Sequence, residues 1–316
     1  MIVEPRSIAI IASREDVSTL AACIRSAIQA CKDRRAVVDV LVNGNPELAH
    51  NIAGLCVDVP PTCVLRVWRI QQGDKAHAWN EYVHRIWASD GDAIFLDGYV
   101  EVEPDSFDAL DRGLATAPEA QGATGVPTCG RSALHLRALM LSEGGFHGNL
   151  NLIRAGVMAK LRASGFRLPL GLYRTDSVTG AVLMLGLDPA ANHWDRRRIA
   201  VVPDAIWNVR SMERITFKNI LGQWKRMLRQ AQGVLENRAV REHLIVRGLA
   251  PHLLPSTAHG LVNGWITAQP AQARRLFIKQ PLCAWVAWRL RVPRDWSAAD
   301  IAPVVVPAPV KRHSIV

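Results

Sequence analysis

Apolar runs of strand length alternate with amphipathic stretches of helix length along the first hundred residues. This alternation is typical of βαβ units, in which strands lie mostly parallel and helices cover the sheet. We therefore predict an α/β fold with a mostly parallel, mixed sheet flanked by helices. The expected strands are residues 7–12, 37–42, 63–68 and 92–96, and the expected helices are residues 13–30, 75–88, 155–164 and 216–236.

Two common nucleotide-binding signatures are missing from this pattern. The first strand is followed by Ala12-Ser13-Arg14-Glu15, without the G-x-G-x-x-G turn of dinucleotide-binding folds, and no G-x-x-x-x-G-K-[ST] occurs. The sequence therefore argues against a Rossmann dehydrogenase and against a P-loop NTPase.

The composition narrows the class of protein further. Six cysteines show no C-x-x-C spacing, which indicates reduced thiols without a zinc site. No run of 18 apolar residues occurs, and the first residues do not form a signal peptide. We expect a cytoplasmic protein, with peripheral attachment to the inner face of the membrane left open.

Positive charge is concentrated in the C-terminal third. The whole chain has 38 Lys/Arg and 28 Asp/Glu; residues 194–316 hold 20 and 7 of these, a balance of +13, which leaves 18 and 21, or −3, before them. Such a segment binds phosphorylated ligands, anionic lipids or nucleic acid. Because no nucleic-acid-binding motif accompanies it, nucleic acid is the partner that we expect least.

Asp97 is the first candidate site residue. It ends an apolar strand, at the edge where α/β folds bind ligands, and it is followed by Gly98 and Tyr99. A D-x-D pair would place two carboxylates on one face of the chain. Here Tyr99 stands in the second position, so Asp97 alone could equally be a turn residue.

Taken in order, five segments resemble the family 2 glycosyltransferases with a GT-A fold, which move a sugar from a nucleotide-diphosphate donor with inversion. The resemblance covers residues 5–235. It implies transfer to a glycan, lipid-linked or other hydroxyl acceptor. The segments are residues 7–26, Val40-Leu-Val-Asn-Gly-Asn45, Gly73-Asp-Lys-Ala-His-Ala-Trp-Asn80, residues 96–107, and Leu172-Tyr-Arg-Thr-Asp-Ser-Val-Thr-Gly-Ala181.

The resemblance assigns donor contacts and leaves the metal open. Lys75 would lie near the diphosphate, which suits a cation at a helix start. Tyr99 replaces the usual metal-binding Asp, so Mn²⁺ or Mg²⁺ would be held by Asp97 and Glu101, or basic residues would compensate. The implied donor is a UDP-linked sugar. The implied donor-binding residues are Ala12, Ser13, Arg14, Asn43, Lys75, Asp97, Gly98 and Tyr99.

The acceptor side follows from two further segments. Asp176 corresponds to the general base, and inversion by a single displacement requires one carboxylate to accept the acceptor's proton. Arg174 and Thr175 precede it. Gln223 and Arg226 resemble the Q-x-x-R-W motif of membrane-associated members, with Met227 in place of Trp.

The chain is expected to divide into a GT-A domain, residues 1–238, and a basic, mainly helical extension, residues 239–316. The extension contains Trp265, Trp285, Trp288 and Trp296, which we expect on its surface among Arg and Lys residues. This mixture suits docking on an anionic membrane surface or on a protein partner.

Two other functions remain open. A catalytically degenerate member would keep the fold as a binding module or scaffold, as Val42 and Tyr99 suggest. A nucleotidyltransferase would share the architecture but lacks its Gly-rich, basic loop here. Each site residue also has a structural interpretation: Lys75 as a solvated lysine, Asp176 as a helix cap, and Gln223 and Arg226 as a helix surface.

Overall fold

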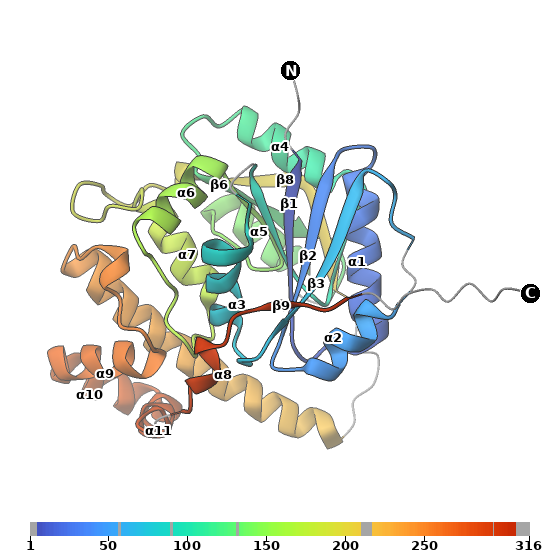
Figure 1. The fold of residues 1–316 in the computed structure, drawn as a ribbon. Coiled ribbons are helices and arrows are strands. Elements are labelled where there is room, and N and C mark those ends of the chain that lie inside the picture. Colours follow the sequence, from blue (N-terminus) through green and yellow to red (C-terminus); the bar gives the residue numbers. More distant parts are fainter. Residues whose placement is uncertain are drawn as a thin grey trace, which may run out of the picture.

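A nine-stranded mixed sheet forms the centre of the computed structural model, which describes residues 5–55, 58–88, 91–130, 133–209, 217–292 and 294–307 (Figure 1). The strand order is β5-β8-β6-β7-β4-β1-β2-β3-β9. The strands are β1 (Arg6–Ala12), β2 (Ala36–Asn43), β3 (Cys63–Ile70), β4 (Ala93–Asp97), β5 (Val100–Val102), β6 (Gly122–Pro127), β7 (Leu150–Ile153), β8 (Ile199–Val209) and β9 (Val304–Val305).

Helices cover both faces of this sheet, so the predicted α/β fold is confirmed. Strands β3, β2, β1 and β4 are parallel neighbours, and β7 then pairs antiparallel with β4. The helices are α1 (Val17–Cys31), α2 (Pro46–Ala53), α3 (Lys75–Glu81), α4 (Ser106–Ala115), α5 (Ala133–Glu143), α6 (Ala155–Ala163), α7 (Thr175–Met184), α8 (Phe217–Arg241), α9 (Ala258–Ala268), α10 (Pro270–Lys279) and α11 (Pro281–Leu290), with short π or 3₁₀ turns at Tyr82–Ile86, Arg196–Arg198, Glu242–Val246, Pro251–Leu253 and Ser297–Asp300.

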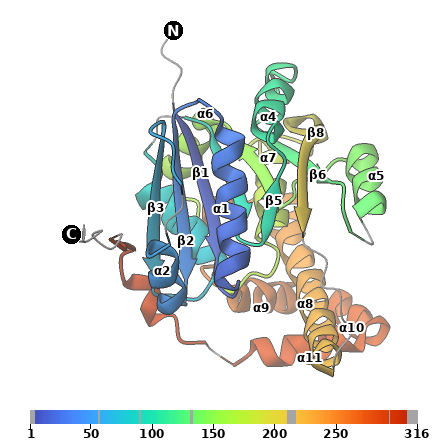
Figure 2. The same cartoon turned by 90° about the vertical axis from the view of Figure 1, so that its right-hand side faces the viewer.

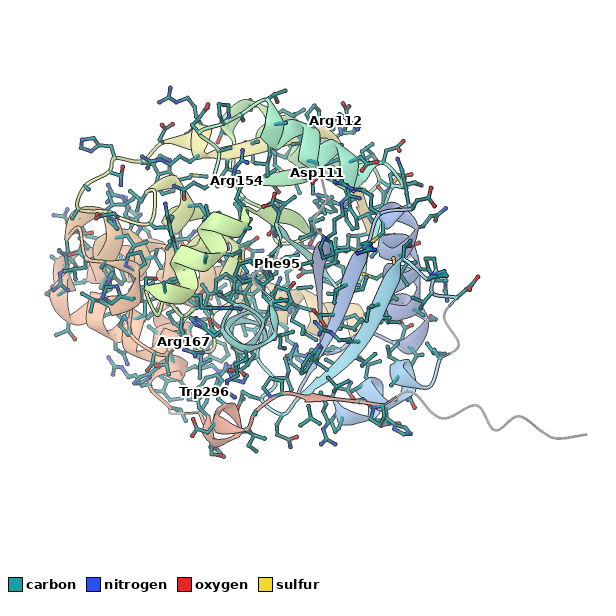
Figure 3. All side chains as sticks on the ribbon, turned by 45° about the horizontal axis from the view of Figure 1, so that its top comes forward. Phe95, Asp111, Arg112, Arg154, Arg167 and Trp296 are labelled. Carbon is teal, nitrogen blue, oxygen red and sulfur yellow. The ribbon has the colours of Figure 1, made fainter. Side chains whose placement is uncertain are left out.

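The two faces of the sheet bury two separate apolar clusters. Along β1, Ile8 and Ile10 belong to the cluster under α1, α2 and α4, whereas Ile11 belongs to the cluster under α3, α6 and α7. This follows from the strand period of two, which sends successive side chains to opposite faces. Figure 3 shows Phe95 of β4 in the interior, where its ring centroid lies 6.1 Å from that of Trp79.

Some helix boundaries differ from the expected ones, for local reasons. Helix α1 begins at Val17 rather than near Ser13, because the Asp16 carboxylate accepts a hydrogen bond from the Thr19 amide at 2.8 Å and caps the helix there. Helix α8 continues to Arg241, so the proposed domain boundary at residue 238 falls inside a helix.

The C-terminal helices gather at the end of the molecule toward which β1 and β2 run (Figure 2). Helices α9 and α11 both pack against α8, and buried side chains of all three join the apolar cluster under α3. The chain then returns to the sheet, where β9 pairs antiparallel with β3. None of the described helices is long and apolar enough to cross a membrane.

One expectation about the extension was wrong. Trp265 is only 3% exposed and belongs to the core on α9, whereas Trp288 is 61% exposed. Trp265 lies four residues after Leu261, which is also buried, so both lie on the inner side of one helix. The composition of the segment alone did not reveal this helical register.

These two tryptophans give a matched test of the packing. Trp265→Ala removes a large buried side chain and should lower the free energy of unfolding by about 3–5 kcal/mol. Trp288→Ala should change it by less than about 0.5 kcal/mol, because the side chain is mostly in solvent. Urea unfolding of both variants measures the difference; equal effects would contradict the placement of α9.

Candidate active site

Two strand ends lie side by side where the sequence places the donor. Asp97 ends β4 opposite Ile11 of β1, and the Gly98 amide donates to the Ile11 carbonyl at 2.9 Å. A Cβ on Gly98 would lie 2.7 Å from that of Ala12, so only glycine permits this approach. The side-chain amide of Asn43, at the end of β2, donates to the Ala12 carbonyl at 2.7 Å. These contacts bring together Ala12, Asn43, Asp97 and Gly98.

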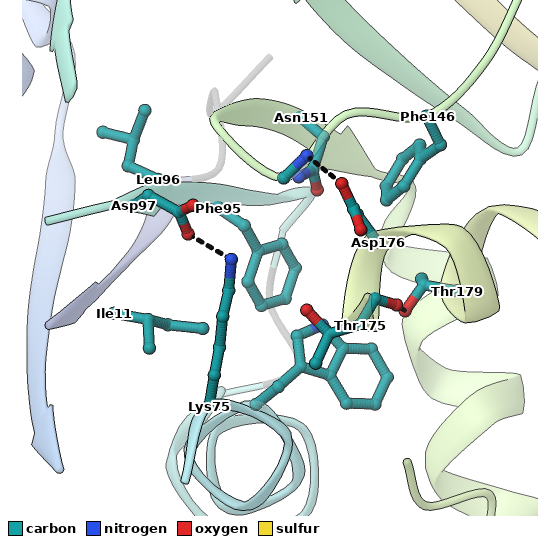
Figure 4. A pocket seen from close by; sticks show the side chains of 12 residues that line it. Ile11, Lys75, Phe95, Leu96, Asp97, Phe146, Asn151, Thr175, Asp176 and Thr179 are labelled. Carbon is teal, nitrogen blue, oxygen red and sulfur yellow. Dashed lines mark hydrogen bonds and ion pairs between the residues drawn. The ribbon is translucent and has the colours of Figure 1, made fainter. Parts of the chain in front are cut away.

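Lys75 reaches the same edge from the first residue of α3. The preceding residue, Asp74, caps this helix by accepting a hydrogen bond from the His77 amide at 2.8 Å. The Lys75 Nζ lies 2.5 Å from Asp97 Oδ1 (Figure 4). Burial acts to lower the pKa of Lys75, but the carboxylates of Asp97 and Asp176 outweigh it and raise that pKa. The site therefore holds a permanent cation.

Tyr99 places a neutral group where a second carboxylate was sought. Its hydroxyl lies 3.0 Å from Asp97 Oδ2 and 3.1 Å from the Asn149 side-chain oxygen, and its single proton can be donated to one of them at a time. Burial, reinforced by the charge of Asp97, raises the pKa of Tyr99 far above its usual range. The phenol therefore stays protonated.

The described residues do not form a metal site held by the protein alone. The two oxygens of Asp97 face Lys75 and Tyr99, and Glu101 lines a different hollow with Ser26 and Asn208. The described residues contain no group of three or more His, Cys, Asp or Glu side chains arranged to hold a metal. A hard divalent cation requires several oxygen ligands, so Asp97 could hold one only together with oxygens from the donor's phosphates and from water.

Asp176 faces Lys75 and Asp97 across a small cavity. Its Oδ2 accepts a hydrogen bond from the Gly148 amide at 3.1 Å, and its Oδ1 accepts one from the Ser177 amide at 2.9 Å. The cap of α7 is Arg174, so Asp176 lies in the first turn and is not itself the cap. Figure 4 shows Lys75 and Asp176 reaching the cavity from two different helices, with Phe95 between them.

The loop before Asp176 is held by buried polar side chains. Asn80 of α3 binds both the amide and the carbonyl of Leu168, at 2.8 and 2.9 Å. The Asp74 carboxylate accepts a hydrogen bond from the Gly171 amide at 2.9 Å. Glu236 of α8 accepts hydrogen bonds from the amides of Tyr173 and Arg174 at 2.9 and 3.2 Å. Helices α3 and α8 together therefore fix the position of Asp176.

Sequence analysis gave no role to these three residues. Asp74 precedes α3 and Asn80 lies near the end of α3, a helix that was singled out for Lys75 alone. An Asp before a helix is a usual cap. Glu236 is an isolated acid in a basic helix, which is a signal that could have been used. Its contacts join residues more than 60 positions apart, so only the folded chain identifies them.

The other residues predicted for the acceptor side lie only partly in this cavity. Thr175 lines it, but the Arg174 side chain extends along α8 and donates to the Gln230 side chain at 2.7 Å. Arg226 lines a separate groove between α8 and the start of α11, together with Met227. The side chain of Gln223 lies outside the described part of the chain.

The Glu15 side chain stabilises the turn after β1. Glu15 accepts hydrogen bonds from the amides of Ser13 and Arg14 at 2.6 and 2.9 Å. The Ser13 carbonyl accepts another from the Asn45 side chain at 3.0 Å. These contacts leave the Arg14 side chain exposed, and it lines a groove beside α8 and α11.

Comparison with known proteins supports the fold. No protein-family model matches the chain, and no curated protein matches it. Among solved structures, it resembles the mannosyltransferase PcManGT from Pyrobaculum calidifontis, solved with GDP-Man and Mn²⁺. The identity is 16%, over 95% of this chain and 87% of the other, with a TM-score of 0.52. The chain therefore has a glycosyltransferase fold.

Glu236 predicts a pH dependence of stability. Burial raises its pKa to about 7 from 4.5, against its hydrogen bonds. The folded state thus binds this proton more tightly, and the contribution to stability that is present below about pH 4.5 is lost as the pH rises through about 7. A shift of this size corresponds to about 3 kcal/mol.

Glu236→Gln cannot ionise and should remove this dependence. We expect the stability of the parent to fall by about 3 kcal/mol relative to Glu236→Gln between pH 4 and pH 8, measured by urea unfolding. Glu47→Gln changes an exposed acid on α2 and should follow the parent at every pH. Parallel curves for the parent and Glu236→Gln would contradict the assignment.

Proposed function

We propose that the protein is an inverting glycosyltransferase that uses a nucleotide-diphosphate sugar. One observation carries the proposal: a cation, Lys75, and a carboxylate, Asp176, line the same small cavity at the end of the parallel strands. Ligands of α/β folds bind at this edge. The likeness to a mannosyltransferase fold supports the proposal.

The proposed reaction assigns one task to each group. The acceptor hydroxyl attacks the anomeric carbon and gives its proton to the Asp176 carboxylate. The bond between that carbon and the diphosphate oxygen breaks, and the nucleoside diphosphate leaves with the electron pair. Lys75 stabilises the negative charge that develops on the leaving group, because an ammonium is a compact phosphate-binding cation. Asp97 and Tyr99 would contact the donor beside it.

The Asp176→Asn variant tests the base. The amide retains an acceptor for a backbone N–H but takes up no proton, so kcat should fall by about 10²–10⁴. The dissociation constant for the donor should stay within about twofold, because the base acts on the acceptor. Turnover can be followed as released nucleoside diphosphate. If Asp176→Asn were as active as the parent, Asp176 would not be the general base. If the parent bound the donor but did not turn it over, the protein would be a binding module.

Lys75→Ala tests how the diphosphate is neutralised. The change removes the cation and leaves the Asp97 carboxylate facing the donor, so donor affinity should fall by about 10–100-fold, or about 1.4–2.8 kcal/mol. In the parent, affinity measured by calorimetry in chelator should lie within about threefold of that with Mn²⁺, because Lys75 already supplies a cation beside Asp97.

Lys160→Ala provides the matched control, because this lysine is exposed on α6 and lines none of the hollows described here. Its affinity for the donor should equal that of the parent. A loss of binding in chelator that Mn²⁺ restores would show instead that a cation neutralises the diphosphate. Comparing UDP-linked and GDP-linked sugars in the same titration would identify the nucleobase of the donor.

A further inference from the structure

A second, larger opening lies on the other side of the loop that positions Asp176. It is a groove of about 670 Å³ between α8, α9, α11 and the segment that follows α11, a volume within the range of small-molecule sites. Gly171 of the loop lines this groove, and Thr175, four residues later, lines the cavity that contains Asp176. The two openings therefore share one short wall.

The groove is lined by positive charge and by no acidic side chain, although the charge of Arg294 also acts on the nearby Asp74 carboxylate. None of the residues that line it is acidic, and among the described residues none of its lysine or arginine side chains lies within 4.0 Å of a carboxylate. Like charges that surround one hollow repel each other, and an anion removes this cost. The basic side chains in the lining are Arg14, Lys225, Arg229, Arg289 and Arg294.

Apolar side chains occupy the remaining walls. Trp288 and Val292 are 61% and 66% exposed, and Leu228 and Val286 line the groove as buried residues. Trp296 also lines it, and its ring would lie 3.2 Å from a Cβ on Gly171. A ligand that fills the whole groove must therefore combine an anionic head with an apolar portion.

The donor accounts poorly for this groove. Apart from Arg14, none of the predicted donor contacts lines it, whereas four of its five cations come from α8, α11 and the following segment. One arginine guanidinium can donate two parallel hydrogen bonds to the oxygens of a phosphate. A diphosphate therefore matches a set of several arginines. An amphipathic diphosphate would occupy the groove with its chain against Trp288 and Val292.

We propose that the groove binds the acceptor, and that this acceptor is a sugar carried on a lipid diphosphate. The diphosphate would lie among the arginines, and the sugar would pass the loop at Gly171 and present its hydroxyl to Asp176. The proposal rests on the proposed function, since it supplies the acceptor of that reaction. The diphosphate would remain in the groove and would add no charge to the cavity that contains Asp176.

Direct binding of farnesyl diphosphate, a probe with the head and chain but no sugar, tests the proposal without turnover. Titration is followed by the fluorescence of the groove tryptophans or by calorimetry, in the parent and in Asp176→Asn. Both should bind it, and both should bind farnesol and inorganic diphosphate at least about tenfold more weakly. Because no reaction occurs, the result is separate from the failure of the glycosyltransferase assignment.

Arginine variants locate the binding site. Arg229→Ala and Arg289→Ala should each weaken binding of farnesyl diphosphate by about tenfold or more. Arg275→Ala removes an exposed charge from α10 that does not line the groove and should leave the affinity unchanged. Thermal unfolding of each variant shows whether the fold is intact.

Three results would overturn the proposal. The first is the absence of binding at low ionic strength. The second is an equal loss in Arg275→Ala, which would indicate general attraction to a basic surface, as for an anionic membrane. The third is displacement of the probe by UDP or GDP together with equal affinity for inorganic diphosphate, which would identify the groove as part of the donor site.

Discussion

The position of Asp176 depends on buried hydrogen bonds to a short loop. Asn80, Asp74 and Glu236 bind the backbone of residues 168–174 from two helices, α3 and α8. Buried amides left without partners would cost about 1–3 kcal/mol each, so the loop has a strong reason to keep this path. Because Lys75 follows Asp74 on α3, the same contacts fix the separation between the cation and the carboxylate. The geometry of the candidate site is therefore set by the residues around the cavity.

The sequence predicted the sheet and the first strands well, because their signals are local. The apolar alternation of β1, its turn and the run before Asp97 are readable within a few residues. Lys75, Asp97 and Asp176 were proposed as site residues from family-like segments, and the structure brings these three to one cavity.

The remaining features depend on contacts between distant residues. The three residues that hold the loop, the burial of Trp265 and the direction of the Arg226 side chain are decided by how α8 and α9 dock on the sheet. The sequence of a helix shows which of its sides is apolar, but it does not show which element packs against that side. The groove is likewise assembled from segments that are about 280 residues apart, from Arg14 to Arg294.

The short strand β9 gives the C-terminal segment a second attachment to the central sheet. Helices α9 and α11 pack against α8, and the start of α9 is hydrogen-bonded to the backbone of Leu170. Strand β9 joins the edge strand β3 through pairs at Trp68 and Arg69. The segment from α9 to β9 is therefore attached to the rest of the protein at both of its ends. Its freedom is that of a closed loop, so any movement of these helices must also bend the connection that carries Trp296.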